Sequence, residues 1–174
     1  VAFDVSRTTF RSEIFPEYKA NRAKTPDEFR SQMSYLHELV SCFGISSFEI
    51  QGYEADDIIA TITKAAEKEG AQVLICTGDR DSFQLISEKT TVLYPKRGVS
   101  DLVRMNAAAL LDKYGMTPEQ YPDFAALRGD PSDNLPSVPG VGEKTAAKWI
   151  IEYGSLKQLL AHVDDLSGKA GQSL

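Results

Sequence analysis

The stretch that decides the fold covers residues 54–81 and reads EADDIIATITKAAEKEGAQVLICTGDRD. Apolar side chains recur at helical spacing over residues 55–69, and the pattern ends at Gly70, which predicts a helix that stops there. Residues 72–77 form a short apolar run that is typical of a buried strand. A helix that leads directly into a buried strand favours a sheet with helices on its faces.

The same alternation of strands and helices extends outward from this stretch as far as residue 116. Residues 91–94 and 102–105 flank a Lys-Arg-Gly turn and are predicted to pair as a hairpin. The expected strands are residues 1–3, 45–50, 72–77, 91–94 and 102–105, and the expected helices are residues 25–43 (with Thr25 as the cap), 55–69 and 106–114. The predicted class is α/β, with a mostly parallel sheet flanked by helices over residues 1–116.

From Thr117 onward the strand patterns disappear. Thr117 and Gln120 have the spacing of a capping box, and helical patterns follow as far as Leu127 and again over residues 143–153 and 155–163. We therefore expect a second, smaller helical subdomain over residues 117–174.

Eight carboxylates are gathered in four tight groups along the chain. They are Asp4; Glu54, Asp56 and Asp57; Asp79 and Asp81; and Asp130 and Asp133. The first three groups each follow an expected strand, and the carboxyl ends of parallel strands share one edge of a sheet. Asp130 and Asp133 come from the helical part and would reach that edge only if the chain folded back over it.

Carboxylates that converge repel one another unless cations lie between them. Hard oxygen ligands, without a cluster of histidine or cysteine, favour magnesium or manganese over zinc. For any single group taken alone, helix capping, the helix dipole or a turn is the favoured explanation. Four groups that fold rules place together favour a metal site.

Two further segments have the chemistry of phosphate sites. Residues 138–142, Val-Pro-Gly-Val-Gly, form a turn before an expected helix, whose free amides can bind a phosphate with Lys144 and Thr145 beside them. A plain turn between packed helices is the alternative. Lys19 and Arg22 share a helical face and could hold a phosphate, although a solvated basic face is favoured when this segment is taken alone.

The composition agrees with a nucleic-acid partner only after the acidic groups are considered. The 174-residue chain has a net charge of −6, from 25 acidic and 19 basic residues. If the eight grouped acids are set aside, 17 acidic residues remain against the 19 basic ones, which is compatible with a phosphate-bearing substrate. No apolar run is long enough to cross a membrane.

The two cysteines and the first residues of the chain give two further expectations. Cys42 and Cys76 lie in apolar stretches and are expected to be buried free thiols, which fits a reducing cytoplasm. The chain opens directly on a strand-like run, so we expect residues to precede Val1.

Several segments together resemble the 5′ nuclease domains of bacterial DNA polymerases I, in the flap endonuclease family. They are VAFD, FPEYKANR, GYEADDIIAT, LICTGDRDSFQLI and ALRGDPSDNLPSVPGVGEKTA, which occur in the family's order over nearly the whole chain. The resemblance implies a metal-binding sheet core, a helix-hairpin-helix (helix-3-turn-helix) element that grips DNA, and two divalent ions, Mg²⁺ or Mn²⁺.

The resemblance also assigns roles to residues. The metal-site positions are Asp4, Glu54, Asp56, Asp57, Asp79, Asp81, Asp130 and Asp133, and the catalytic basic residues are Lys19 and Arg22. The implied DNA contacts are Tyr18, Lys19, Arg22, Gly140, Val141, Gly142, Lys144 and Thr145. A potassium ion is implied at the backbone carbonyls of the hairpin, at Val138 and Val141.

The implied function is two-metal hydrolysis of 5′-flapped or nicked DNA, in primer removal and repair. The implied protein is a cytoplasmic monomer that binds DNA at a flap, nick or duplex junction, without a membrane, and is fused to a polymerase. The family pattern begins with a further metal-ligating aspartate that this chain lacks, and Ser137 stands where glycine is usual. Loss of that aspartate could produce a catalytically incomplete DNA-binding module, which is one alternative. A PIN-type ribonuclease, which shares an acidic α/β core, is the other, although the hairpin at residues 140–142 argues against it.

Overall fold

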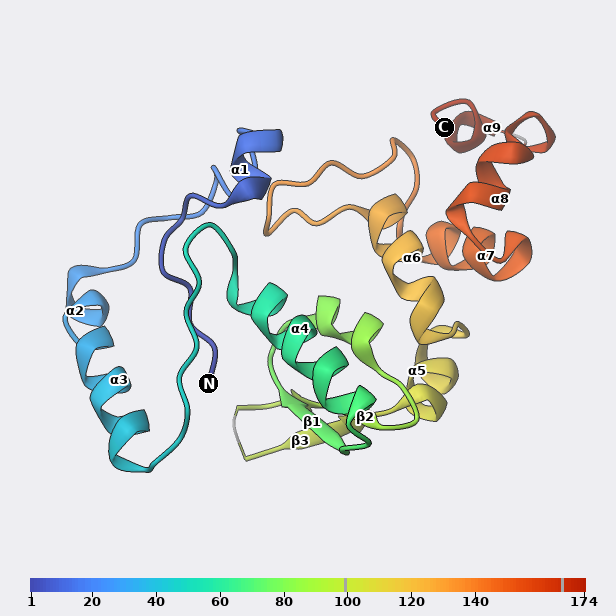
Figure 1. The fold of residues 1–174 in the computed structure, drawn as a ribbon. Helices are drawn as coiled ribbons and strands as arrows, with labels where there is room; N and C mark the ends of the chain where they lie inside the picture. Colours follow the sequence, from blue (N-terminus) through green and yellow to red (C-terminus); the bar gives the residue numbers. More distant parts are fainter. Residues whose placement is uncertain (99, 167) are drawn as a thin grey trace. The chain divides into compact units, whose positions relative to one another are not determined.

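The computed structural model describes residues 1–98, 100–166 and 168–174 (Figure 1). The chain forms two compact units. The first contains Val1–Ile62 together with Ser132–Asn134, and the second contains Thr63–Pro131 and Leu135–Leu174. Among the described residues, no helix is long and apolar enough to cross a membrane.

The first unit contains short helices and extended segments. The helices are α1 (Phe10–Ile14), α2 (Asp27–Arg30), α3 (Met33–Cys42) and the first turns of α4 (Ala55–Lys68). The strands expected at residues 1–3 and 45–50 are reduced to one parallel bridge between Ala2 and Phe48. A pair of extended segments is marginal without further strands beside it, and the described part of this unit offers none.

The helix expected over residues 25–43 is interrupted. It begins after Pro26 rather than at a Thr25 cap, and Pro26 itself takes the N-cap position with φ −53° and ψ 144°. The hydroxyl of Ser31 and the amide of Gln32 both donate to the carbonyl of Glu28, at 2.8 and 3.1 Å. Such side-chain bonds compete with the helical ladder, which explains the break between α2 and α3.

The second unit is built on a small mixed sheet. Its strands are β1 (Val73–Cys76), β2 (Thr90–Pro95) and β3 (Leu102–Met105), in the order β1-β2-β3. The pair β1–β2 is parallel, and β2–β3 is the hairpin predicted from the sequence. The α/β class is thus confirmed, but the described sheet has one parallel and one antiparallel pair and is not mostly parallel.

The expected burial of the two thiols is wrong. Cys42 and Cys76 are free, as predicted, but both are exposed. Cys76 ends β1, which pairs on one side only, and alternate side chains of a strand point to opposite faces. Leu74 is exposed on the same face as Cys76, at 56%.

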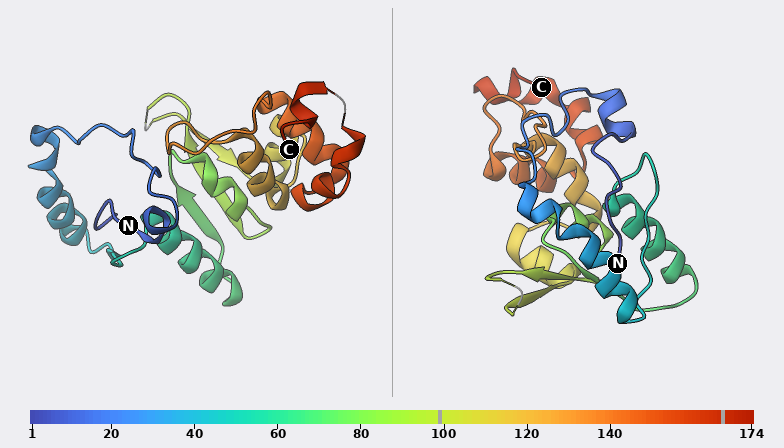
Figure 2. Two further views of the ribbon diagram at one scale, coloured as in Figure 1. Left: turned by 90° about the horizontal axis from the view of Figure 1, so that it is seen from above. Right: turned by 90° about the vertical axis from the view of Figure 1, so that its left-hand side faces the viewer.

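Helices dominate the rest of the second unit. They are η1 (Arg80–Leu85), α5 (Ala107–Tyr114), η2 (Pro118–Gln120), α6 (Tyr121–Arg128), α7 (Glu143–Tyr153), α8 (Leu156–Ala161), η3 (Val163–Asp165) and α9 (Gly168–Gly171). The predicted caps are present, since Asn106 accepts a hydrogen bond from the amide of Ala109 and Thr117 forms a capping box with Gln120. Helix α6 packs against α7, and α7 packs against α8 (Figure 2).

The core of the second unit lies where η1 meets α6. Phe83 of η1 and Tyr121 of α6 are fully buried, with ring centroids 5.5 Å apart in an edge-on arrangement. The ring centroid of Phe124 lies 5.5 Å from that of Tyr121. Aromatic pairs of this geometry add stability beyond the area that they bury. The core therefore fixes η1, which carries Asp81, against the helix that leads to Asp130.

A carboxylate near the end of α4 ties this helix to β2. Glu67 accepts hydrogen bonds from the hydroxyls of Ser87 and Thr90, and from Lys64 at 3.2 Å. The ammonium of Lys89 donates to the backbone carbonyl of Glu67 at 2.9 Å. The two hydroxyl bonds are the main cause that lowers the pKa of Glu67 to about 2.

This shift predicts a stability that depends on pH. The folded pKa of Glu67 lies below its ordinary value of 4.5, so its contribution is complete above pH 4.5 and is lost as the pH falls toward 2. We expect Glu67→Gln to lower the melting temperature at pH 7, with a difference from the wild type that shrinks as the pH falls below 4.5. Melting curves at a series of pH values test this, and a constant difference would contradict it.

Candidate active site

In the first unit, a buried carboxylate at the start of α4 receives three side-chain hydrogen bonds. Glu54 is 7% exposed. Its oxygens accept from the ammonium of Lys19 at 2.8 Å, the hydroxyl of Tyr18 at 3.1 Å and the hydroxyl of Thr9 at 3.4 Å. A carboxylate buried to this degree requires such partners to offset the loss of hydration.

Asp133 is the second buried carboxylate of the first unit, at 9% exposed. The guanidinium of Arg22 forms a close ion pair with it, and the Tyr18 hydroxyl donates to it at 3.1 Å. The Lys19 ammonium lies 3.7 Å from it, so Lys19 and Tyr18 each touch both carboxylates. Burial, and then the negative charges of Asp133 and Glu54, raise the pKa of Tyr18, which keeps its phenol protonated.

The other predicted metal-site acids of the first unit lie at the amino end of α4. Asp4 accepts a hydrogen bond from the amide of Ala55 at 2.7 Å, and Asp57 accepts from the amide of Glu54 at 2.9 Å. Arg11 holds both oxygens of Asp57 at 2.7 Å, and this bond is the main cause of the lowered pKa of Asp57. Asp56 lies on the same first turn of the helix.

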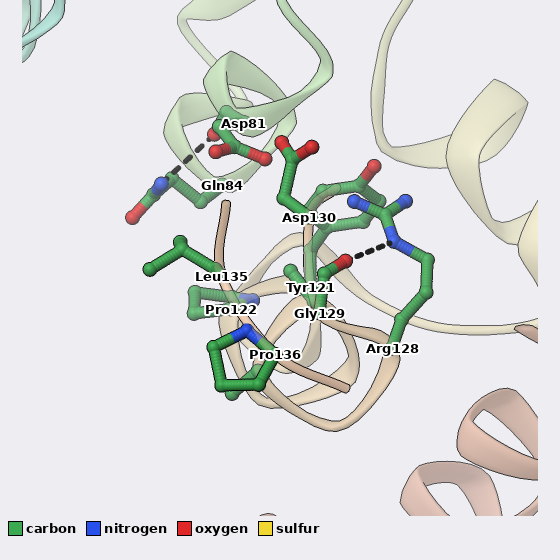
Figure 3. Close-up of a pocket in the computed structure, with 11 residues that line it drawn as sticks. Asp81, Gln84, Tyr121, Pro122, Arg128, Gly129, Asp130, Leu135 and Pro136 are labelled. Carbon is green, nitrogen blue, oxygen red and sulfur yellow. Dashed lines mark hydrogen bonds between the residues drawn. The ribbon is translucent and has the colours of Figure 1, made fainter. Parts of the chain in front are cut away.

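In the second unit, Asp79 caps a helix, which is one of the explanations that the sequence allowed for this acidic group. Its carboxylate accepts from the amide of Asp81 at 2.9 Å and begins η1. Asp81 and Asp130 line one pocket of about 390 Å³, and Figure 3 shows their carboxyl groups turned toward each other at its rim. Gln84, which donates to the carbonyl of Asp81 at 2.9 Å, also lines this pocket, as do Tyr121, Leu135 and Pro136 (Figure 3).

The predicted metal residues are thus distributed over both units. Asp4, Glu54, Asp56, Asp57 and Asp133 belong to the first unit, and Asp79, Asp81 and Asp130 to the second. Within the described parts of the chain, no group of three or more histidine, cysteine or acidic side chains could hold a metal ion. A common metal centre for all four acidic groups therefore stays a prediction. The donor set itself, carboxylate oxygens throughout, fits magnesium or manganese.

The hairpin predicted before α7 is a tight turn. Val141 donates its amide to the carbonyl of Val138 at 2.9 Å, and its side chain is buried, which anchors the turn. Gly140 has φ +80°, a conformation that favours glycine, and Gly142 is the N-cap of α7. Lys144 is exposed and Thr145 is half-buried in the first turn of that helix.

Three residues that contact or support this site received no role from the sequence, although Arg11 belongs to the basic residues around Lys19 and Arg22. Arg11 pairs with Asp57, Thr9 donates to Glu54, and the amide of Asn134 donates to the carbonyl of Glu17 at 2.7 Å. A signal existed for Thr9, since Thr9 and Ser12 form a capping box at the start of α1. Asn134 follows a Pro-Ser-Asp turn, where a left-handed asparagine is common.

Comparison with known proteins identifies the family. The model of the 5′-3′ exonuclease N-terminal resolvase-like domain matches residues 1–115. The model of the 5′-3′ exonuclease C-terminal SAM fold matches residues 116–174. This chain belongs to the 5′-3′ exonuclease family. The resemblance inferred from the sequence motifs is thereby confirmed.

Curated relatives of this exonuclease-family chain are much longer proteins. DNA polymerase I of Mycobacterium tuberculosis is 60% identical over 173 residues, which are 99% of this chain and 19% of that protein. DNA polymerase I of Bacillus subtilis is 48% identical over 169 residues, which are 97% of this chain and 19% of that protein. The chain thus spans about a fifth of the length of these relatives.

Solved structures share the fold of this exonuclease-family chain. The bacteriophage T5 flap endonuclease, in a complex with DNA and metal ions, is 26% identical with a TM-score of 0.79, over 99% of this chain and 66% of that one. The catalytic core of Rad2 with DNA has a TM-score of 0.60 at 20% identity, over 94% of this chain and 50% of that one. The second likeness concerns the fold alone.

Proposed function

We propose that this chain is the 5′ nuclease part of a DNA polymerase I and hydrolyses phosphodiesters in 5′-flapped or nicked DNA. The observation that carries the proposal is the close set of Lys19, Arg22 and Tyr18 around the buried carboxylates of Glu54 and Asp133. Basic groups beside carboxylates are what a phosphodiester and its metal ions together require. Family membership and the T5 flap endonuclease likeness support the choice of substrate.

The eight carboxylates are the proposed holders of two divalent ions, Mg²⁺ or Mn²⁺. When bound, such ions stabilise charge on the phosphate and lower the pKa of a water nucleophile. The residues themselves supply oxygen donors of the right hardness, and the amide of Asp81 orients one of them, the carboxylate of Asp79. Arg11 occupies both oxygens of Asp57, so a metal ion would compete with Arg11 for that carboxylate. The T5 5′-exonuclease has been crystallised with divalent zinc bound.

Lys19 and Arg22 are proposed to neutralise the charge that develops on the scissile phosphate. In the structure, both cations are paired with carboxylates, Lys19 with Glu54 and Arg22 with Asp133. Those carboxylates are also proposed metal ligands. Metal binding and release of the two cations toward the phosphate are therefore linked, because one carboxylate oxygen cannot serve both partners fully.

The hairpin before α7 is proposed to bind the DNA backbone. The first amides of a helix lack intrahelical partners and bind phosphate well, and Lys144 adds a positive charge beside them. The proposed potassium ion would use the carbonyls of Val138 and Val141 in the same turn. Contacts of this kind are independent of base sequence, so affinity for DNA should fall steeply with salt.

The proposal is tested by offering three substrates to the full-length gene product with Mg²⁺. They are a duplex with a DNA 5′ flap, the same duplex with an RNA flap, and single-stranded RNA. We expect cleavage close to the junction of the flapped duplexes. Flap binding without cleavage would favour the DNA-binding module, and preferred cleavage of single-stranded RNA would favour the ribonuclease.

Lys19→Met should separate catalysis from metal binding. We expect the cleavage rate to fall by about 10²-fold because a cation at the phosphate is lost. Mn²⁺ affinity should increase, because Glu54 loses the partner that competes with the metal. Single-turnover cleavage and calorimetric Mn²⁺ titration measure the two effects.

Lys113→Met is the matched control for this variant, since Lys113 lies on α5 over the ring of Tyr114. It should change neither the rate nor the Mn²⁺ affinity. Weaker Mn²⁺ binding by Lys19→Met would contradict the linkage between the lysine and the metal.

A further inference from the structure

The tip of the loop between α6 and α7 is attached to the segment that carries the catalytic cations. The tip consists of Ser132–Asn134, and the basic segment consists of residues 17–22, which include Lys19 and Arg22. Both belong to the first unit. The amide of Lys19 donates to the carbonyl of Asp133 at 2.9 Å, and Nε of Arg22 donates to the carbonyl of Ser132 at 3.1 Å. Both contacts end on backbone carbonyls of the tip, whereas the ion pairs of Lys19 and Arg22 end on the Asp133 carboxylate.

Asn134 contributes the third of these attachments. Its side-chain amide donates to the carbonyl of Glu17 at 2.7 Å, two residues before Lys19. The two segments therefore hold each other from both sides of Lys19, by Asn134 on Glu17 and by Arg22 on Ser132. A segment fixed at both ends keeps its central side chain in one place.

The backbone at this contact is in an uncommon conformation. Lys19 has φ +56° and Asn134 has φ +59°, and they are the two residues other than glycine with positive φ in the described parts of the chain. Such a conformation is costly for a lysine and persists only when the surroundings impose it. Asparagine adopts it more easily than other residues with a side chain.

The contact at position 134 suits asparagine better than aspartate or glycine. Aspartate is nearly isosteric and tolerates the same φ, but an ionised carboxylate has no proton to donate to the Glu17 carbonyl and would repel it. Glycine accepts the backbone conformation but has no side-chain donor. Of these three residues, only asparagine combines tolerance of the left-handed backbone with a side-chain donor.

We propose that Asn134 is a positioning residue that holds the left-handed turn at Lys19, so that the Lys19 ammonium stays at Glu54 and Asp133. The kinetic part of this inference rests on the proposed nuclease function. The structural part, that Asn134 holds the Lys19 turn, does not depend on any activity.

The test compares Asn134→Asp with wild type in the full-length gene product. We expect kcat for cleavage of a 5′-flapped DNA duplex to fall about 10- to 100-fold, with KM within about twofold, as a misplaced catalytic group predicts. Hydrogen exchange at the amide of Lys19 should become faster, because its bond to Asp133 loosens. Asn134→Gly keeps the backbone conformation and should show a smaller loss, about 5-fold, for one missing hydrogen bond.

Asn106→Asp is the matched control for the chemistry of the substitution. Asn106 acts as an acceptor, toward the amide of Ala109 at 2.9 Å, and an aspartate serves there equally well. It should leave kcat and Lys19 exchange at their wild-type values. Unchanged Lys19 exchange in Asn134→Asp would overturn the inference, whether or not the protein cleaves DNA. Unchanged kcat in a protein that does cleave flaps would overturn it as well.

Discussion

Asp79→Asn combined with Asp81→Asn is expected to lower the rate of flap cleavage by about 10³-fold or more, because two of the proposed metal ligands lose their charge. The fold should survive. Asp79 caps η1 through an acceptor oxygen, and asparagine caps a helix as well as aspartate does. Single-turnover cleavage of a 5′-flapped duplex in Mg²⁺ measures the rate, and the melting temperature and the Kd for the same duplex show whether the fold is intact.

Asp123→Asn is the matched control for the double variant. Asp123 accepts from the amide of Leu156 at 2.9 Å and lies among packed helices rather than among the predicted metal ligands. It should cleave at the wild-type rate. Robust cleavage by the double variant would exclude Asp79 and Asp81 from the metal site.

The second large effect concerns stability, for Gly129→Ala. Gly129 ends α6 with φ +69° and ψ 177°, a combination almost restricted to glycine. A Cβ there would lie 2.5 Å from the backbone nitrogen of Ser137 and 2.7 Å from the carbonyl carbon of Pro136. Backbone atoms cannot rotate away as a side chain can, so we expect a loss of about 3–5 kcal/mol.

Thermal unfolding should show a drop of about 10 °C or more for Gly129→Ala in a chain of this length. Gly154→Ala is the control, because Gly154 has φ +82° but no atom within 4 Å of an added Cβ. It should cost about 1 kcal/mol, for the backbone conformation alone. Equal losses of melting temperature in the two variants would show that the close approach to Ser137 does not contribute to the destabilisation.

The local elements of the second unit could be predicted well from the sequence. The hairpin of β2 and β3, the Asn106 cap and the Thr117 capping box each depend on a few neighbouring residues, and local chemistry decides them. The same is true of Gly142 before α7, where the turn residues are themselves the signal.

The first unit was harder to predict because its structure depends on distant partners. Residues 1–3 have the composition of a strand, but a strand requires neighbours along its whole length. Among the residues that the structure describes, Ala2 forms a bridge with Phe48 alone. The side-chain bonds of Ser31 and Gln32 to Glu28 interrupt a helix that has good periodicity. Hydrophobic periodicity indicates which face of a helix would be buried, but it does not reveal such competing side-chain hydrogen bonds.

The candidate site shows the same division. Acidic groups after apolar runs could be found from the sequence, and so could the Lys19–Arg22 pair. That Lys19 and Tyr18 each touch both Glu54 and Asp133 could not, because residues 18 and 133 are separated by more than half of the chain. The left-handed Lys19 was also unpredictable, since no local preference of lysine favours that conformation.

The central claim is that acidic residues of this chain act through divalent metal ions on a DNA phosphodiester. The most direct measurement is the single-turnover rate of 5′-flap cleavage by the full-length gene product as Mg²⁺ is titrated from zero, in the presence of potassium. The account predicts no cleavage in EDTA and a rate that rises more steeply than single-site saturation, because more than one ion is required. Cleavage at an undiminished rate in EDTA, or none at any concentration of Mg²⁺ or Mn²⁺, would contradict it.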